Sequence, residues 1–152
     1  MKLRLVSVGK DKGFTADGVS EYAGRLRRSC ELELLELRAA AGPAARDQEG
    51  AAILAQSGKV KGAHELWALD ERGRELTSPE LAERVRRVRD ASGTLTLCIG
   101  GDEGLSDEVR RGAALVWSLS KLTLPHRLAR VVVLEQLYRA FEILRGSPYH
   151  RQ

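Results

Sequence analysis

Strand-like and helix-like segments alternate along the whole sequence, and this alternation limits the possible folds more than any other feature. Short apolar runs predict strands, and longer runs with an apolar stripe every three or four residues predict helices. The predicted strands cover residues 2–8, 32–37, 66–69, 94–99 and 115–119. Since strands joined through helices make right-handed crossovers, we expect a parallel α/β open sheet with helices on both faces, in one domain over residues 1–152.

The predicted helices lie between these strands. They are a helix that carries Val19 to Leu26 and ends near Arg28, one over residues 44–56, one from Ser78 toward Gly93, one after Ser106, and one over residues 126–145. Two of them have clear starting signals. Ser78-Pro79-Glu80 provides an N-cap oxygen, a residue with helical φ and a carboxylate near the positive helix end. Ser106 is a similar cap, because two acidic residues follow it.

The composition is that of an ordinary folded protein. Hydrophobic residues make up 43% and charged residues 30% of 152 residues, and no stretch approaches the ~20 apolar residues of a membrane span. We therefore expect a cytoplasmic protein with no membrane contact. The net charge of +4 permits RNA binding without establishing it. The arginines between residues 84 and 89 follow a helical pattern, which favours a solvated face over a phosphate track.

The two cysteines do not predict a metal site. Cys30 and Cys98 have no CxxC spacing and no histidine nearby. We interpret them as small hydrophobic residues of a reducing compartment, rather than as a disulfide or a metal pair. No metal is expected.

Two unusual loops follow the last two predicted strands. Ligands of open parallel sheets bind beyond the carboxyl ends of the strands. One loop, Gly100-Gly101-Asp102-Glu103-Gly104, allows a close approach of its backbone, although a plain tight turn would explain the same glycines. It is neither GxGxxG nor GxxxxGK[ST], so the usual nicotinamide and nucleoside-triphosphate cradles are missing.

The other loop, Leu119 to His126, is more apolar than a surface connection usually is. We expect it to be buried, with its amides and carbonyls bonded to other backbone or to a bound molecule such as an adenine. A packed core strand is the alternative.

Several segments resemble one known family. They are Trp117-Ser-Leu-Ser-Lys-Leu-Thr-Leu-Pro-His126, Arg130-Val-Val-Val-Leu-Glu-Gln-Leu-Tyr-Arg-Ala140, Ser147-Pro-Tyr-His150, Ile99-Gly-Gly-Asp-Glu-Gly-Leu105 and Lys2-Leu-Arg-Leu-Val-Ser-Val-Gly9. Together they resemble the RlmH family, the ribosomal RNA pseudouridine N3-methyltransferases of the SPOUT class. Length and order agree over the whole chain, whereas Ala39 to Gly62 matches poorly. Asp102 stands where relatives often have proline.

The resemblance implies a SPOUT fold with a C-terminal trefoil knot, an obligate homodimer, and a large-subunit ribosomal RNA or ribosome as substrate. It also implies that S-adenosylmethionine binds, bent, in the knot. The residues implied to hold this cofactor are Leu69, Gly100, Leu119, Ser120, Lys121, Leu122, Thr123 and Leu124.

The tail Tyr149-His150-Arg151 has the side chains that the reaction needs. N3 of pseudouridine becomes a nucleophile only as its proton leaves, so a base and a cation near the flanking oxygens would assist. We assign His150 as first candidate for the base, Arg151 for the cation, and Tyr149 for stacking on or hydrogen-bonding to the nucleobase. The alternative is that these residues are only a flexible chain terminus. His126 is a second base, a substrate contact or merely part of the first helical turn. Glu135, Tyr138 and Arg139 orient the tail or the partner subunit, and Arg130 meets phosphate.

The closing helix gives separate support for a dimer. Its apolar residues spread around more than one stripe, which favours an interface helix over one buried within the monomer. These residues are Val131, Val132, Val133, Leu134, Leu137, Tyr138, Phe141, Ile143 and Leu144. Two other functions stay open from the residues alone. One is a different α/β enzyme with a nicotinamide cofactor, and the other is a non-catalytic RNA-binding or assembly factor.

Overall fold

The computed structural model describes residues 1–151, apart from the side chain of His150. Within this range, five parallel strands form one sheet in the order β2-β1-β4-β3-β5. The strands are β1 (Lys2–Val8), β2 (Glu31–Leu37), β3 (His64–Glu75), β4 (Thr94–Ile99) and β5 (Leu115–Ser118). The helices are α1 (Phe14–Leu26), α2 (Ala45–Ser57), α3 (Ser78–Asp90), α4 (Asp107–Gly112), α5 (His126–Arg145) and the 3-10 helix η1 (Pro148–Arg151). The predicted parallel α/β sheet is confirmed.

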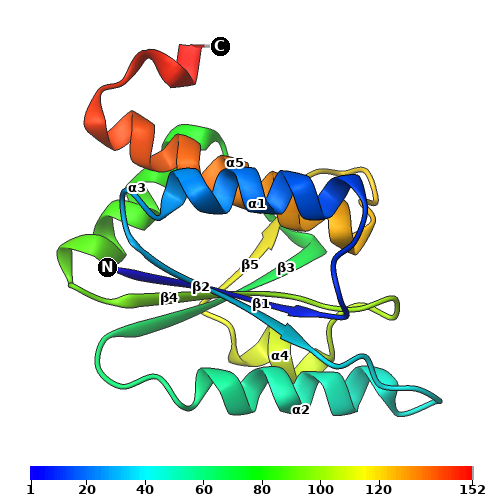
Figure 1. Cartoon of the computed structure of the whole chain (residues 1–152). Helices are drawn as coiled ribbons and strands as arrows, with labels where there is room; N and C mark the ends of the chain where they lie inside the picture. The colour runs from blue at the N-terminus through cyan, green and yellow to red at the C-terminus, as the bar shows by residue number, and fades with distance from the viewer. Residues whose placement is uncertain (152) are drawn as a thin grey trace.

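Helices cover both faces of the sheet. Helices α1, α3 and α5 lie on one face, and α2 and α4 lie on the other (Figure 1). Successive side chains of β1 point to opposite faces, so Leu3 and Leu5 pack in the core under α1, α3 and α5, whereas Val6 and Val8 pack in the core beside α2 and α4. Cys98 is buried in this second core, Cys30 is half-buried, and both are free thiols.

Strand β3 is longer than its apolar run predicts. We predicted residues 66–69, but the strand reaches Glu75 and pairs with β5 a second time through Arg74, after a register shift. The polar residues after Leu69 ended the apolar pattern that sequence reasoning follows. Gly73 permits this close crossing, because a Cβ there would lie 2.4 Å from the carbonyl oxygen of Val116.

The predicted cap of α3 is wrong by one residue. Thr77, not Ser78, is the N-cap: its hydroxyl accepts from the Glu80 amide, and the Glu80 carboxylate accepts from the Thr77 amide in return. Ser78 is the first helical residue, and its hydroxyl donates to the side chain of Gln136 on α5 over 2.7 Å. The Ser106 cap of α4 is confirmed.

Helices α1 and α5 run side by side in the same direction. A Cβ at Gly18 would lie 3.0 Å from Val131, and the rings of Tyr22 and Tyr138 are 6.4 Å apart, one and two turns further along. Helix α5 packs against the sheet, α1 and α3, which bury Val133, Leu134 and Leu137 completely. Part of its apolar surface is therefore covered within the chain, whereas Val131, Val132, Tyr138, Ile143 and Leu144 stay partly exposed, so the interface helix stays a prediction.

Candidate cofactor site and C-terminal tail

A cleft of about 730 Å³ lies at the carboxyl ends of β3, β4 and β5. The loops that follow these strands form its walls, together with the first turn of α5. This is the edge at which open parallel sheets bind ligands, because the loops there converge around a gap that the strands leave open. The two unusual loops of the sequence are thus brought together.

The glycine loop forms one wall with bare backbone. Gly101 and Gly104 bridge each other, the Gly104 amide donates to the Gly101 carbonyl over 3.0 Å, and Gly104 has a φ of +75°. A Cβ at Gly100 would lie 2.5 Å from the carbonyl carbon of Gly104. The loop is therefore both a tight turn and a cleft wall, and it folds this closely only because these positions lack side chains.

The apolar loop forms the opposite wall, but it is not buried as predicted. Leu122 is 73% exposed, and Lys121 and Thr123 are exposed as well. No described segment of the chain packs over these side chains, so their apolar character serves a surface rather than a core. The correction does not remove the loop from the site, since seven of its residues line the cleft.

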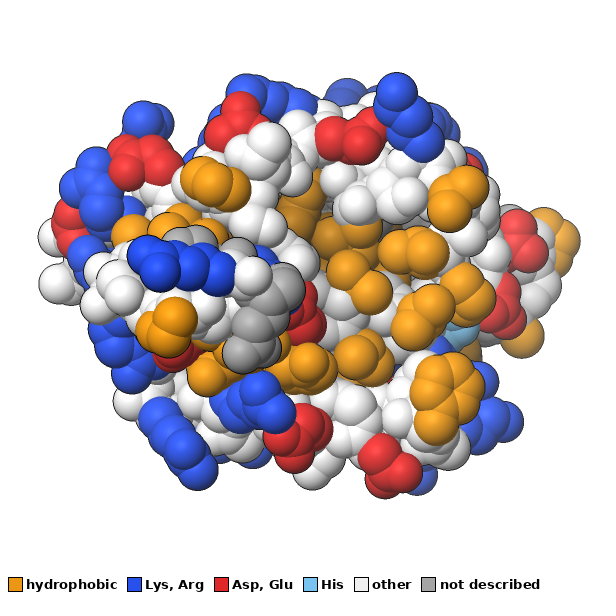
Figure 2. Space-filling view, turned by 90° about the horizontal axis from the view of Figure 1, so that it is seen from above, with side chains coloured by type: hydrophobic (Ala, Val, Ile, Leu, Met, Phe, Trp, Pro, Cys, Tyr) orange, Lys and Arg blue, Asp and Glu red, His pale blue; other side chains and the backbone are white. Residues whose placement is uncertain are grey.

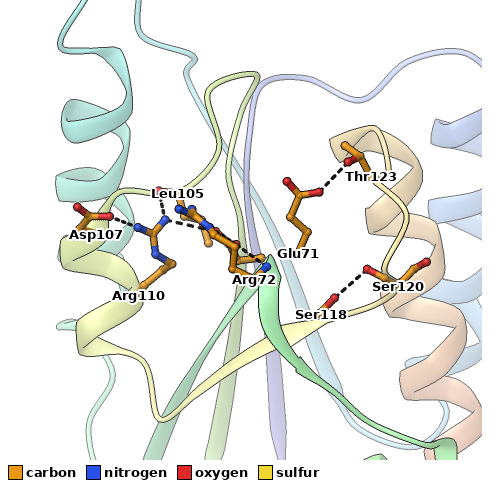
Figure 3. A network of polar contacts seen from close by, with 9 residues as sticks. Glu71, Arg72, Leu105, Asp107, Arg110, Ser118, Ser120 and Thr123 are labelled. Carbon is orange, nitrogen blue, oxygen red and sulfur yellow. Dashed lines mark hydrogen bonds and ion pairs between the residues drawn. The ribbon is translucent and has the colours of Figure 1, made fainter.

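Short hydrogen bonds fix the shape of this loop (Figure 3). The Ser118 hydroxyl donates to the Ser120 carbonyl, and the Ser120 hydroxyl accepts from the Leu122 amide, each over 2.9 Å. The Thr123 hydroxyl donates to Glu71 over 2.7 Å and so joins the loop to the bend of β3. The apolar wall is held in place without a bound molecule.

Most residues that the resemblance assigned to the cofactor line this one cleft. They are Leu69, Gly100, Leu119, Ser120, Leu122, Thr123 and Leu124. Lys121 is the exception, because it is exposed and does not line the cleft. That these residues bind S-adenosylmethionine stays a prediction.

Sequence reasoning missed a polar network beside the cleft. The Asp70 side chain is only 7% exposed and accepts from Arg72 over 2.9 Å and from Arg110 over 3.4 Å. These contacts, first of all that with Arg72, hold the pKa of Asp70 below its usual value. Arg110 also bonds Asp107 and the Leu105 carbonyl, so the network ties the β3 bend to α4 and to the end of the glycine loop (Figure 3). Sequence analysis assigned no role to residues 70–73, because they follow the apolar run of residues 66–69 and contain no known motif.

His126 lies in the cleft at the first residue of α5. Its Nε2 is 3.1 Å from a carboxylate oxygen of Asp102, and its Nδ1 is buried with no hydrogen-bond partner among the described residues. The ring lines the cleft and also belongs to the first turn of α5, so the structure is compatible with all three roles left open by the sequence. Its role stays a prediction.

The tail lies at the far end of α5 from the cleft. Helix α5 has 20 residues and so spans about 30 Å, with His126 at its first residue and η1 beyond its last. Figure 1 shows the C-terminal segment projecting from the end of α5. Within one chain, the cleft and the tail are therefore not brought together.

Tyr149 of η1 is bound to helix α5 of the same chain. Its hydroxyl donates to Glu135 over 3.2 Å, its ring meets that of Tyr138 edge-on at 4.8 Å, and the Arg139 guanidinium lies 5.0 Å from its centre. Burial, a bond to Tyr22 and the charge of Glu135 raise the pKa of Tyr149. The prediction that these α5 residues orient the tail is confirmed. Arg151 is exposed, and the side chain of His150 lies outside the described residues.

Two predictions about arginines have opposite outcomes. Arg130 does not meet phosphate: it is 2% exposed and donates to the carbonyls of Val8 and Gly9 over 2.7 and 2.9 Å, because α5 packs over the end of β1. The solvated face on α3 is confirmed, since Glu83 and Asp90 pair with its arginines at 86, 87 and 89. Among the described side chains, no cluster of His, Cys, Asp or Glu could hold a metal ion.

The chain matches a family model described as predicted SPOUT methyltransferase over residues 1–150. The chain belongs to the SPOUT methyltransferase family. It is 48% identical to ribosomal RNA large subunit methyltransferase H of Anaeromyxobacter dehalogenans, over 99% of this chain and 100% of that one. It is 45% identical to the protein of the same name from Geobacter sulfurreducens, over 99% of both chains.

Solved structures support the fold. A probable methylase family protein from Haemophilus influenzae superposes with a TM-score of 0.60 at 14% identity, over 97% of this chain and 69% of that one. A probable methyltransferase from Bordetella pertussis gives a TM-score of 0.59 at 15% identity, over 91% and 93%. This parallel α/β sheet is therefore a SPOUT-class fold, while the trefoil knot itself stays a prediction.

Proposed function

We propose that this protein transfers a methyl group from S-adenosylmethionine to N3 of a pseudouridine in large-subunit ribosomal RNA. The observation that carries this proposal is the cleft, whose walls are the glycine loop and the apolar loop that contain the strongest family motifs. Relatives of nearly the same length, named for ribosomal RNA large subunit methylation, support the substrate class.

The cleft fits this cofactor. Its volume of about 730 Å³ is in the range of small-molecule sites, and it combines apolar side chains with accessible backbone, as an adenosyl group requires. The cleft also contains the carboxylates of Glu71, Asp102 and Glu103, which complement a ligand with a sulfonium and an ammonium group. Leu69, Gly100 and the loop from Leu119 to Leu124 would hold the cofactor, which supplies an already activated methyl group.

The remaining chemistry is removal of the imide proton and stabilisation of the charge that it leaves. A base near the acceptor nitrogen would take this proton, for which His150 is the first candidate and His126, already in the cleft, is the second. The guanidinium of Arg151 would stabilise the negative charge on the two carbonyl oxygens beside N3. Tyr149 is so firmly bound to α5 that we assign it the positioning of this tail.

A complete site then needs two copies of the chain. Since the tail of one chain lies about 30 Å of helix away from its own cleft, a second copy would have to supply His150 and Arg151. An isologous homodimer does this twice, once at each cleft. We propose this homodimer, with the trefoil knot of its class in each single-domain subunit.

The proposed place of action is the ribosome in the cytoplasm. A small domain with diffuse charge has few side chains with which to read base sequence, so a folded ribosomal surface is a better substrate than a short hairpin. In residues 1–151, no helix is long and apolar enough to cross a membrane.

The direct test uses purified protein, radiolabelled S-adenosylmethionine and ribosomes that lack the modification. We expect label at N3 of one pseudouridine of the large-subunit RNA. Thermal stabilisation by S-adenosylmethionine and not by NAD would exclude a nicotinamide enzyme. Cofactor binding without any transfer to ribosomes would contradict the proposed reaction and favour an assembly factor.

A further inference from the structure

Phe14 is the most exposed large hydrophobic residue of the described chain. Its side chain is 78% exposed at the first position of α1, where nothing in the chain covers it. A single exposed hydrophobic side chain is common on protein surfaces, so its surroundings decide whether it marks a contact site.

Phe14 lies at the same end of the molecule as the cleft. Helices α1 and α5 run side by side in the same direction, with Gly18 against Val131, and Phe14 and Arg127 are each one turn earlier on their helices. Arg127 lines the cleft, and its guanidinium donates to the carbonyl of Lys10 over 3.1 Å. The loop from Lys10 to Phe14 therefore borders the mouth of the cleft.

Hydrogen bonds within the loop fix the backbone that carries Phe14. The Asp11 carboxylate accepts from the Lys12 amide over 3.0 Å and from the Thr15 hydroxyl over 2.7 Å. Gly13, with a φ of +69°, turns the chain into α1. A ring presented by such a loop loses little conformational entropy when it contacts a partner.

Unneutralised positive charge surrounds the ring. In the part of the chain that the structure describes, no carboxylate lies within ion-pair distance of Lys10, Lys12 or Arg127. The Asp11 carboxylate of the same loop hydrogen-bonds only neutral donors and so offsets part of this positive charge, while Glu36 is paired with Arg130. The three cations still exceed the one carboxylate. Helix α3 differs, because carboxylates of the same helix pair with its arginines and neutralise most of the charge that a phosphate could bind.

We infer that Phe14, Lys10, Lys12 and Arg127 form an RNA-contact surface, on which Phe14 stacks with an unpaired base and the three cations contact phosphates. Single-stranded RNA is recognised by aromatic rings next to basic side chains, because every base has a stacking face and every nucleotide a phosphate. The inference rests on the proposed function, since it places the RNA beside the cleft that would hold the methyl donor.

A second copy of the chain fits this surface less well. Figure 2 shows the face of α1, α3 and α5, where hydrophobic side chains gather in a band and basic side chains lie mostly around its margin. A two-fold contact centred on Phe14 would bring Lys10, Lys12 and Arg127 close to their own copies, and like charges oppose that arrangement. A two-fold axis nearer the middle of α5, as the tail exchange of the proposed homodimer requires, does not pass through Phe14, and the molar mass of Phe14→Ala tests whether the partner covers this ring.

The test compares Phe14→Ala and Phe14→Tyr with the unchanged protein. Measurements are KM and kcat with unmodified large ribosomal subunits, Kd for S-adenosylmethionine, and molar mass by light scattering. We expect Phe14→Ala to raise KM about 10-fold, and Phe14→Tyr to restore it to within about twofold, because both rings stack. Cofactor Kd and molar mass should not change.

The charges are tested with Lys10→Gln combined with Lys12→Gln. The slope of log affinity for the ribosomal subunit against log salt should become shallower by about 1.4 to 1.8, the loss of two phosphate contacts. The control is Lys59→Gln combined with Lys61→Gln, an equal change of charge on two exposed residues. These residues precede β3 and so lie at the amino ends of the strands, whereas the cleft lies at the carboxyl ends. Its slope should equal that of the unchanged protein.

Two results would overturn the inference while leaving the proposed function standing. One is an unchanged KM for Phe14→Ala in a protein that methylates ribosomes. The other is a fall in its molar mass, which would make Phe14 a contact between copies of the chain. If the unchanged protein transfers no methyl group, the proposed function fails first.

Discussion

His126 on α5 and Asp102 in the glycine loop meet across the cleft, with Nε2 and a carboxylate oxygen 3.1 Å apart. Because the Asp102 side chain is 90% exposed, this contact adds little stability. Its effect is to turn the imidazole toward the glycine loop and to join two walls of the site.

Replacement of His126 by Gln should lower kcat about 100-fold if the imidazole takes the imide proton. Glutamine keeps a similar size and a hydrogen-bonding group, so cofactor Kd and Tm should stay close to those of the unchanged protein. Single-turnover kinetics with saturating cofactor measures this. An unchanged rate would reduce His126 to a residue of the first helical turn.

Arg151→Ala should leave cofactor affinity nearly unchanged and strongly reduce turnover, since the proposed partner of its guanidinium is the nucleobase and not the cofactor. Equal loss of both would indicate a misfolded site. Mixing Arg151→Ala subunits with cleft-defective Gly100→Ala subunits should recover about a quarter of the activity, because half of the dimers then contain one intact cleft with one intact tail. No recovery after subunit exchange would contradict a tail that acts on the partner.

Gly100→Ala should weaken cofactor binding at least about 10-fold, because the new methyl group collides with the backbone of Gly104 and forces the loop open. The matched control is Gly24→Ala on α1, where a Cβ meets nothing within 4 Å. That change should stabilise the protein by about 0.5–1 kcal/mol and leave cofactor binding unaltered. Calorimetric titration and thermal unfolding measure both effects.

Arg130→Met should destabilise the protein by about 3 kcal/mol, because it leaves the carbonyls of Val8 and Gly9 without their donor. Burial already lowers the pKa of this arginine, yet its hydrogen bonds keep it in place. Denaturant unfolding measures the loss. Arg89→Ala, on the exposed face of α3, should change stability by less than about 0.5 kcal/mol.

Asp70→Asn should remove an acid-sensitive part of the stability. The pKa of Asp70 is lower in the folded protein than its ordinary value of 3.8, so its ionised form stabilises the fold above that pH. The contribution is lost as the pH falls through the lower, folded pKa. The Tm difference between the two proteins should therefore be largest at neutral pH and shrink as the pH falls below 3.8.

Local patterns predicted most elements because each depends on neighbours in the sequence. Helix α5 begins and ends at the predicted residues, since Pro125 and Gly146 delimit a long periodic run. The Thr77 cap was missed although the sequence contains its signal: Glu80 stands three residues after Thr77, the spacing of a capping box, whereas Leu81 stands three residues after Ser78. The bond from Ser78 to Gln136 on another helix is the part that no local pattern contains.

The sequence determined which loops would form the site. The strand-end rule selected the glycine loop, and apolar character marked the loop from Leu119 as unusual, before any packing was known. Both signals depend only on residues that are neighbours in the sequence, so they can be recognised without a structure.

Tertiary structure decided how these loops are used. It placed the apolar loop on an open cleft wall instead of in the core, buried Arg130 against the end of β1, and set the tail a helix length from the cleft. It also brought Asp70 and Arg110 together from separate elements. Burial and distance depend on segments far apart in the chain, and no pattern of neighbouring residues contains that information.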